Sequence, residues 1–258
     1  SDDSEVHLGA FAAETDNAAI ENCTNRAEIV VADAADATPR TMILSGFVGK
    51  AFNGVTLRNC RNTGNISFSS PALYMIGGFV GAVQEDDGLY TIADCHNTAD
   101  FDNAGSNSGW NFMGGIAGKT ISRQLVPGET SNYRLIVEEC SSTGTISIAG
   151  PSKVRASGIV AQTQGAYRIS GCTFSGAIES TDVTKRDVVI GGIMAMADKE
   201  CVGLVEGCTF SGRISAAQAG ANNFFGGIYG NNGGAASVVN DCRTTASAYV
   251  GCPIGKSV

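Results

Sequence analysis

Long apolar runs, histidine, proline and positive charge are all scarce in this 258-residue chain. No run approaches the roughly 18 apolar residues of a membrane-spanning helix, so we expect no membrane span. The 17 lysines and arginines are scattered and the net charge is −8, which argues against a nucleic-acid partner. His7 and His96 are the only histidines and belong to no Ser-His-Asp, Cys-His or His-x-x-x-His grouping. We therefore predict no catalytic triad, no metal site and no cofactor.

Cysteine, in contrast, recurs in one local phrase, Cys-x-(Asn/Ser/Phe/Thr)-x-(Gly/Ala)-x-(Ile/Phe/Ala). The seven copies begin at Cys23, Cys60, Cys95, Cys140, Cys172, Cys208 and Cys242. Successive copies lie 37, 35, 45, 32, 36 and 34 residues apart, which is the period range of stacked supersecondary units. The chain is therefore predicted to be a repeat protein.

A glycine phrase alternates with the cysteine phrase. Its copies are Gly46-Phe47-Val48-Gly49, Gly77-Gly78-Phe79-Val80-Gly81, Gly114-Gly115-Ile116-Ala117-Gly118, Gly158-Ile159-Val160-Ala161, Gly191-Gly192-Ile193-Met194-Ala195 and Gly226-Gly227-Ile228-Tyr229-Gly230, with a degenerate copy at Gly9-Ala10-Phe11-Ala12-Ala13. Two phrases in step predict one domain of seven repeats over residues 9–248. Residues 1–8 are predicted to form an N-terminal cap, and residues 249–258 a C-terminal tail or cap.

The residues between these phrases indicate short strands. The position three residues before each cysteine is always apolar and the position five before is often apolar, which is the period of a strand with one inward face. The cysteine begins a second inward face and the glycine phrase a third strand. The fold is therefore predicted to be all-β: a parallel β-helix (β-solenoid) of about seven coils of ~35 residues, with three short strands per coil.

Stacking also predicts what fills the interior. Asn25, Asn62 and Asn97 form one inward column that can hydrogen-bond along the axis, until phenylalanine replaces asparagine at Phe174 and Phe210. The seven phrase cysteines are expected to form a column of buried free thiols, because parallel Cα–Cβ bonds about 4.8 Å apart do not suit a disulfide. Cys201 and Cys252 lie outside the phrase and remain the disulfide candidates.

The glycine phrase resembles the GLUG repeat, named for Gly-Leu-any-Gly, of secreted and surface proteins of bacteria. Gly78-Phe79-Val80-Gly81, Gly115-Ile116-Ala117-Gly118 and Gly227-Ile228-Tyr229-Gly230 fit it best, with Phe or Ile in place of Leu. The resemblance covers all seven units. It implies an extracellular or cell-surface location and a structural or adhesive role, and it carries over no catalytic residue.

Two candidate binding surfaces emerge. Alternation turns one residue of each glycine phrase outward, which predicts an apolar interface column; its members are Val48, Val80, Ala117, Val160, Met194 and Tyr229. The alternatives are that other residues cover the column, or that the column faces inward.

Trp110, the single tryptophan, lies with Asn107 and Asn111 in an amide-rich stretch and, with Tyr133 from the next coil, would suit a sugar ring. The alternative is a tryptophan that pins a corner.

Carboxylates give weaker candidates. Glu85-Asp86-Asp87-Gly88 could hold calcium, although its spacing matches no calcium loop. Asp94 and Glu139 occupy the same place in adjacent coils, as the paired carboxylates of a glycosidase would. In both cases the alternative is a solvated acidic corner.

We therefore expect a non-enzymatic, adhesin-like surface protein. Its partner would be a host or dietary glycan or a surface protein, and self-association along a face or an end is a further expectation. The alternative is a polysaccharide lyase or glycoside hydrolase, which requires a cleft with convergent Asp, Lys or Arg residues. The positive residues do not gather in register along the sequence, which favours the non-enzymatic role.

Overall fold

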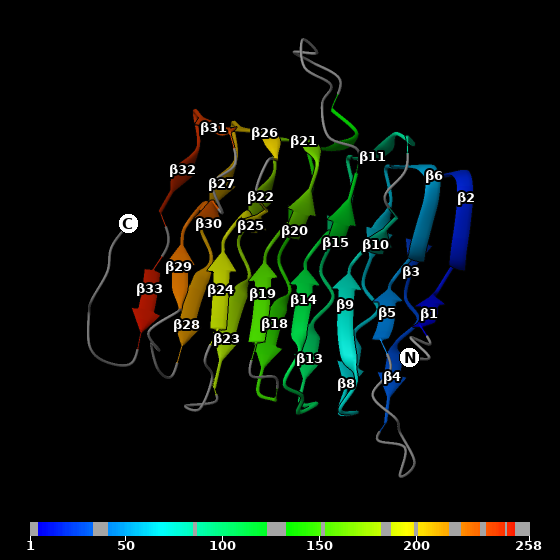
Figure 1. The fold of residues 1–258 in the computed structure, drawn as a ribbon, viewed down its shortest axis with the longest axis horizontal. Coiled ribbons are helices and arrows are strands. Elements are labelled where there is room, and N and C mark those ends of the chain that lie inside the picture. The colour runs from blue at the N-terminus through cyan, green and yellow to red at the C-terminus, as the bar shows by residue number, and fades with distance from the viewer. Residues whose placement is uncertain are drawn as a thin grey trace.

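A computed structural model describes most of the chain and contains no helix in the described residues. These are residues 5–32, 41–84, 87–122, 133–150, 153–181, 187–198, 201–216, 223–232, 236–245 and 247–250. Each strand pairs in parallel with the equivalent strand of the neighbouring repeat, and the chain runs from β1 at one end to β33 at the other (Figure 1). The predicted single parallel β-solenoid is confirmed. No helix in the described part is long and apolar enough to span a membrane.

Four sheets run along the axis. Sheet A contains β1 (Glu5–Gly9), β5 (Thr41–Ser45), β9 (Leu73–Gly77), β14 (Trp110–Gly114), β19 (Lys153–Ser157), β24 (Asp187–Gly191) and β29 (Phe224–Gly226). Sheet C contains β3 (Thr24–Asn25), β7 (Arg61–Asn62), β12 (His96–Asn97), β17 (Ser141–Ser142), β22 (Thr173–Phe174), β27 (Thr209–Phe210) and β32 (Arg243–Thr244). Sheet D contains β4 (Ile29–Val31), β8 (Ile66–Phe68), β13 (Phe101–Asn103), β18 (Thr145–Ile148), β23 (Ala177–Ser180), β28 (Arg213–Ala216) and β33 (Ser247–Val250).

Sheet B has two arms. Its first arm contains β10 (Val80–Val83), β15 (Ala117–Ile121), β20 (Val160–Gln164), β25 (Met194–Ala197) and β30 (Tyr229–Asn232). Its second arm contains β11 (Tyr90–Ala93), β16 (Leu135–Glu138), β21 (Ala166–Ser170), β26 (Val202–Glu206) and β31 (Ala236–Asn240). The long strands β2 (Ala12–Glu21) and β6 (Val48–Arg58) run through both arms.

The number of strands per coil differs from the prediction of three. A coil such as residues 73–103 passes through sheet A, both arms of sheet B, sheet C and sheet D as five separate strands. The glycine phrase is a corner rather than one strand, because Gly78 and Phe79 form a bend between β9 and β10. The stretch after the cysteine bends as well, which separates sheet C from sheet D.

A left-handed corner precedes every phrase cysteine. The preceding residue has a φ between 48° and 61° in all seven repeats, and these residues are Asn22, Asn59, Asp94, Glu139, Gly171, Gly207 and Asp241. Asparagine, aspartate and glycine tolerate this conformation best. The corner directs the next side chain inward, where the Cys60 thiol donates to the carbonyl oxygens of Arg58 at 3.2 Å and Ile20 at 3.5 Å. The thiol is therefore a small side chain that also satisfies corner carbonyls.

The polar interior column is confirmed. The Asn25 Nδ2 donates to Asn62 Oδ1 at 2.8 Å, and the Asn62 Nδ2 donates to Asn97 Oδ1 at 2.8 Å. Further along the axis, Phe174 and Phe210 stack with ring centroids 5.6 Å apart. The glycine phrase explains why both columns fit. A methyl group at Gly78 would lie 3.0 Å from the Asn97 amide, so the phrase glycine makes room for the column across the coil.

Residues next to both predicted cap boundaries belong to strands of the solenoid. Residues 5–8, expected in the N-terminal cap, belong to β1, which pairs with β5 from Glu5 opposite Thr41 to Gly9 opposite Ser45. The backbone of these residues is extended and continues the ladder of sheet A, so the first coil starts earlier than the phrases suggest. At the other end residues 249 and 250 belong to β33, and residues 251–258 lie outside the described residues.

The thiol column gives a direct prediction. The eight described cysteines, Cys201 included, are free, and six of them are buried; Cys252 lies outside the described residues. Burial raises the pKa of the Cys60 thiol to about 11. We therefore expect a thiol reagent at mildly alkaline pH to react with few native cysteines, and with at least eight after denaturation without reductant. Fewer than eight reactive thiols after denaturation would contradict the stacked column.

Candidate functional site

The predicted outward column is wrong. Val48, Val80, Val160 and Met194 are fully buried, and Tyr229 is partly buried with its hydroxyl 2.7 Å from that of Tyr167. The physical reason is the bend inside the glycine phrase, which resets the alternation of side chains. Phe79 before the bend and Val80 after it both pack in the core. The column contributes to stability and offers no interface.

The predicted sugar site around Trp110 is only partly assembled. Asn111 is fully buried, because alternation on β14 turns it inward, and its Nδ2 donates to Asn107 Oδ1 at 2.8 Å and to Gly109 O at 3.0 Å. Asn107 in turn donates to Ala72 O at 2.8 Å. These amides brace the corner before β14. Tyr133 lies just before β16, which belongs to the second arm of sheet B, whereas Trp110 belongs to sheet A.

Trp110 instead belongs to a cation–aromatic cluster, which we define as Trp110, Phe112, Lys119, Lys153 and Arg155. The Arg155 guanidinium carbon lies 4.4 Å from the Trp110 ring centroid and 5.6 Å from that of Phe112. The Lys153 Nζ lies 5.8 Å from the Trp110 centroid, and the Lys119 Nζ lies 5.3 Å from the Phe112 centroid. The cluster joins sheet A to the first arm of sheet B on the outer surface, since the inward residues of β14 are Asn111 and Met113.

Asp198 organises the polar side of this cluster. Its Oδ1 accepts from Arg155 Nη1 at 3.5 Å, and its Oδ2 accepts from Gln162 Nε2 at 2.5 Å and from Gln164 Nε2. Two buried atoms of the same network have no partner in the described part of the chain: the Arg155 Nε and the Gln162 Oε1. The negative charge of Asp198 is thus fully engaged, while the network keeps one spare donor and one spare acceptor.

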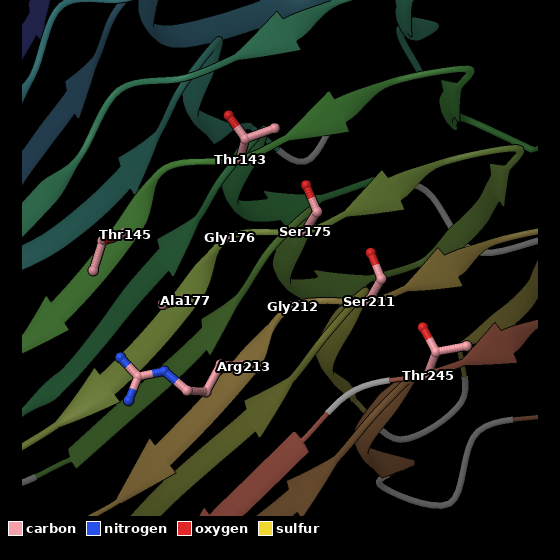
Figure 2. Close-up of a pocket in the computed structure, with 9 residues that line it drawn as sticks. All are labelled: Thr143, Thr145, Ser175, Gly176, Ala177, Ser211, Gly212, Arg213 and Thr245. Carbon is pink, nitrogen blue, oxygen red and sulfur yellow. The ribbon is translucent and has the colours of Figure 1, made fainter.

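A second candidate site lies between sheets C and D. A cavity of about 550 Å³ opens there, and Figure 2 shows its lining. Thr143, Ser175, Ser211 and Thr245 form a row across four successive repeats, each three residues after its phrase cysteine, with the hydroxyls pointing the same way (Figure 2). The remaining lining residues are Thr145, Gly176, Ala177, Gly212 and Arg213. We call this the hydroxyl pocket.

The hydroxyl pocket is shallow, polar and built from exposed side chains. All four residues of the hydroxyl row are exposed, and Arg213 at its side pairs with Glu179 through Nη2. The residues that line it within the described part of the chain include no carboxylate, histidine or cysteine. The pocket can therefore form hydrogen bonds with a hydrophilic ligand. Its hydroxyl groups recur once per coil, at the spacing of neighbouring strands.

The carboxylate candidates do not converge on a ligand site. Glu85 and Asp86 lie outside the described residues, and Asp87 is exposed. Asp94 and Glu139 are both exposed and occupy left-handed corners of adjacent coils, which accounts for their alignment. No group of three or more metal-ligating side chains occurs in the described ranges.

The two histidines are in polar contacts with near neighbours. His7 contacts Glu14 at 2.6 Å and Glu5 at 2.9 Å, and His96 Nδ1 lies 2.8 Å from the Ser141 hydroxyl.

Sequence reasoning missed both the cluster and the hydroxyl pocket, although signals for them exist. Aligning Gly115 with Gly158 places Trp110 opposite Lys153 and Phe112 opposite Arg155, which is the observed register. Lys119, Lys153 and Arg155 gather at this corner across two sheets, although none of them lies in register with another positive residue. Counting three residues past each cysteine finds the hydroxyl row.

Comparison with known proteins gives no relative from which a role could be transferred. No family model matches the chain, and no curated protein and no solved structure matches it significantly.

Proposed function

We propose that this chain is a non-enzymatic, adhesin-like β-solenoid, secreted or displayed on a bacterial surface, that binds a glycan along its flank. The resemblance to GLUG repeats supports export and an adhesive role. The observation that carries the proposal is the hydroxyl pocket, which presents the same kind of polar side chain in four successive repeats.

The pocket suits an extended neutral polymer for three physical reasons. Its row of hydroxyls offers donors and acceptors at the spacing of stacked strands, roughly 4.8 Å. Gly176 and Gly212 line the pocket with backbone atoms alone, which adds polar peptide groups to the hydroxyl row. Arg213 adds a charged donor at the edge, half-exposed beside Glu179. A chain of sugar residues carries matching hydroxyls along its length, whereas an apolar ligand finds little to bury.

The proposal predicts that filling the pocket abolishes glycan binding. Ser175→Tyr and Ser211→Tyr place large side chains at exposed positions of the row, so we expect both variants to fold while glycan-array signals fall at least about tenfold. Thr63→Tyr is the matched control, because Thr63 holds the equivalent exposed position outside the pocket. An array on which wild-type protein binds nothing, or on which all three variants bind equally, would refute the proposal.

The second candidate function is a polysaccharide lyase or glycoside hydrolase. The cation–aromatic cluster with Asp198 favours it, because such an enzyme needs charged residues that converge at one place. Incubation of the purified chain with neutral and acidic polysaccharides, followed by chromatography for shortened products, separates the two candidates. Depolymerisation would replace the non-enzymatic proposal, and intact polymer together with array binding would support it.

A further inference from the structure

The cation–aromatic cluster holds more positive than negative charge. Lys153 has a partner in Asp187, with Nζ and Oδ2 4.0 Å apart, and Arg155 has one in Asp198. Lys119 has none: within the described residues no carboxylate oxygen lies within 4.0 Å of its Nζ. Its neighbours in the adjacent coils, Ala82 and Gln162, are uncharged. The cluster therefore has three positively charged side chains, Lys119, Lys153 and Arg155, and only two of them are paired with a carboxylate.

The surroundings of Lys119 make this imbalance costly. Its ammonium lies over the Phe112 ring, in a half-buried position with little water around it. Burial is the largest influence on Lys119 and lowers its pKa; attraction by Asp198 and, more weakly, by Glu5 raises the pKa, repulsion by Arg155 lowers it, and the net shift is downward. An ammonium withdrawn from water without a counterion is unfavourable, and an anion placed beside it would restore the balance.

The rest of the cluster cannot supply that anion. Asp198 already accepts from Arg155, Gln162 and Gln164. Gln162 is 2% exposed, and its Oε1 and the Arg155 Nε remain without partners. These two atoms are shielded from solvent and do not themselves meet a ligand, so the partly exposed Lys119 ammonium is the group that an anion from outside the chain would pair with.

We propose that this corner is an anion-binding site, in which Lys119 pairs with a carboxylate or sulfate group carried by an acidic saccharide. Trp110 of the cluster and Gln164, which donates to Asp198, are both partly exposed and suit the apolar and polar faces of a sugar. The site lies between sheets A and B, whereas the hydroxyl pocket lies between sheets C and D, so the inference does not rest on the proposed function.

Lys50 provides a matched control within the same row of sheet B. It follows the register Lys50, Ala82, Lys119, and its Nζ lies 5.4 Å from the Phe52 ring centroid, as Lys119 lies over Phe112. Unlike Lys119, it has a carboxylate partner, Glu5, with Nζ and Oε2 2.5 Å apart. The two lysines hold equivalent positions on β6 and β15, each with a phenylalanine ring near its ammonium, and differ in whether a carboxylate lies within 4.0 Å.

Isothermal titration calorimetry at low ionic strength tests the site with four probes: a galacturonate trimer, a sulfated disaccharide, a neutral galactose trimer and sodium sulfate. We expect the acidic saccharides to bind and the neutral trimer to bind at least about tenfold more weakly. Sodium sulfate separates a free anion from a saccharide-borne one. Lys119→Gln should weaken acidic binding at least about tenfold, Lys119→Arg should retain it, and Lys50→Gln should leave it unchanged.

We expect Asp198→Asn to raise the affinity for acidic saccharides, because the substitution removes a negative charge that competes with them. Circular dichroism melting confirms that each variant is folded before binding is compared. Equal binding of acidic and neutral trimers, no binding of any acidic probe, or equal affinities in the Lys119→Gln and Lys50→Gln variants would overturn the inference. Cleavage of the acidic trimer that Lys119→Gln abolishes would support the anion site while refuting the non-enzymatic function.

Discussion

Replacing Gly192 by alanine is expected to destabilise the solenoid by about 3 kcal/mol or more, a large part of the stability of a typical domain. The added methyl group would overlap two fixed neighbours, the carbonyl oxygen of Gly227 in the next coil and the ring of Phe210. Phe210 is 1% exposed and stacked on Phe174, so the ring has no space to retreat. Urea unfolding followed by circular dichroism measures the loss.

Gly207 separates this steric effect from backbone strain. It has a φ of 59°, and a methyl group there would meet no atom closer than 3.8 Å. Gly207→Ala should therefore cost only about 1–2 kcal/mol. Gly207→Asn should cost less, because Asn22 and Asn59 adopt the same conformation at the equivalent corners. If Gly192→Ala is no more harmful than Gly207→Ala, the glycine phrase does not make room for the interior column.

Asn62→Ala is expected to remove about 2–4 kcal/mol of stability, because it takes the middle member out of the interior ladder. Asn62 is fully buried and joined by hydrogen bonds of 2.8 Å to Asn25 on one side and Asn97 on the other. Both bonds disappear at a fully buried position, which leaves the Asn25 and Asn97 amides without their partners. The measurement is again the free energy of unfolding in urea.

Asn65 is the control for this second prediction. It is an exposed asparagine of the same coil, and its Oδ1 accepts a single hydrogen bond of 2.9 Å from the Asp100 amide. Solvent can take its place, so Asn65→Ala should cost less than about 1 kcal/mol. Comparable losses for Asn62→Ala and Asn65→Ala would show that the buried ladder adds nothing beyond an ordinary surface contact.

The sequence predicts the fold well because the repeat multiplies weak local signals. A cysteine after a bend-forming residue means little once, but seven aligned copies indicate a corner, and the φ values at Asn59, Asp94 and Gly171 agree. The inward asparagine column follows from the same alignment. Local alternation failed where the chain turns: Phe79 and Val80 are adjacent and both buried, because a corner lies between them.

The candidate sites were harder to predict because they depend on pairing across coils and sheets. The single tryptophan in an amide-rich stretch predicts a ligand site, whereas the Asn107 and Asn111 amides bond to one another and to backbone and brace a corner. The contact of Lys119 with Phe112 joins two sheets across a bend. The repeat period shows which residues of equivalent strands are neighbours, but it does not show which side chains of β14 and β15 meet across the bend between them.

Mapping of amide chemical shifts during titration with a neutral oligosaccharide selected on the array is the most direct test of glycan binding at the hydroxyl pocket. We predict saturable shifts in one continuous row, at Thr143, Ser175, Ser211 and Thr245, with the amides of sheet A unchanged. Absence of saturable shifts, or shifts confined to the corner between sheets A and B, would contradict the proposed binding surface.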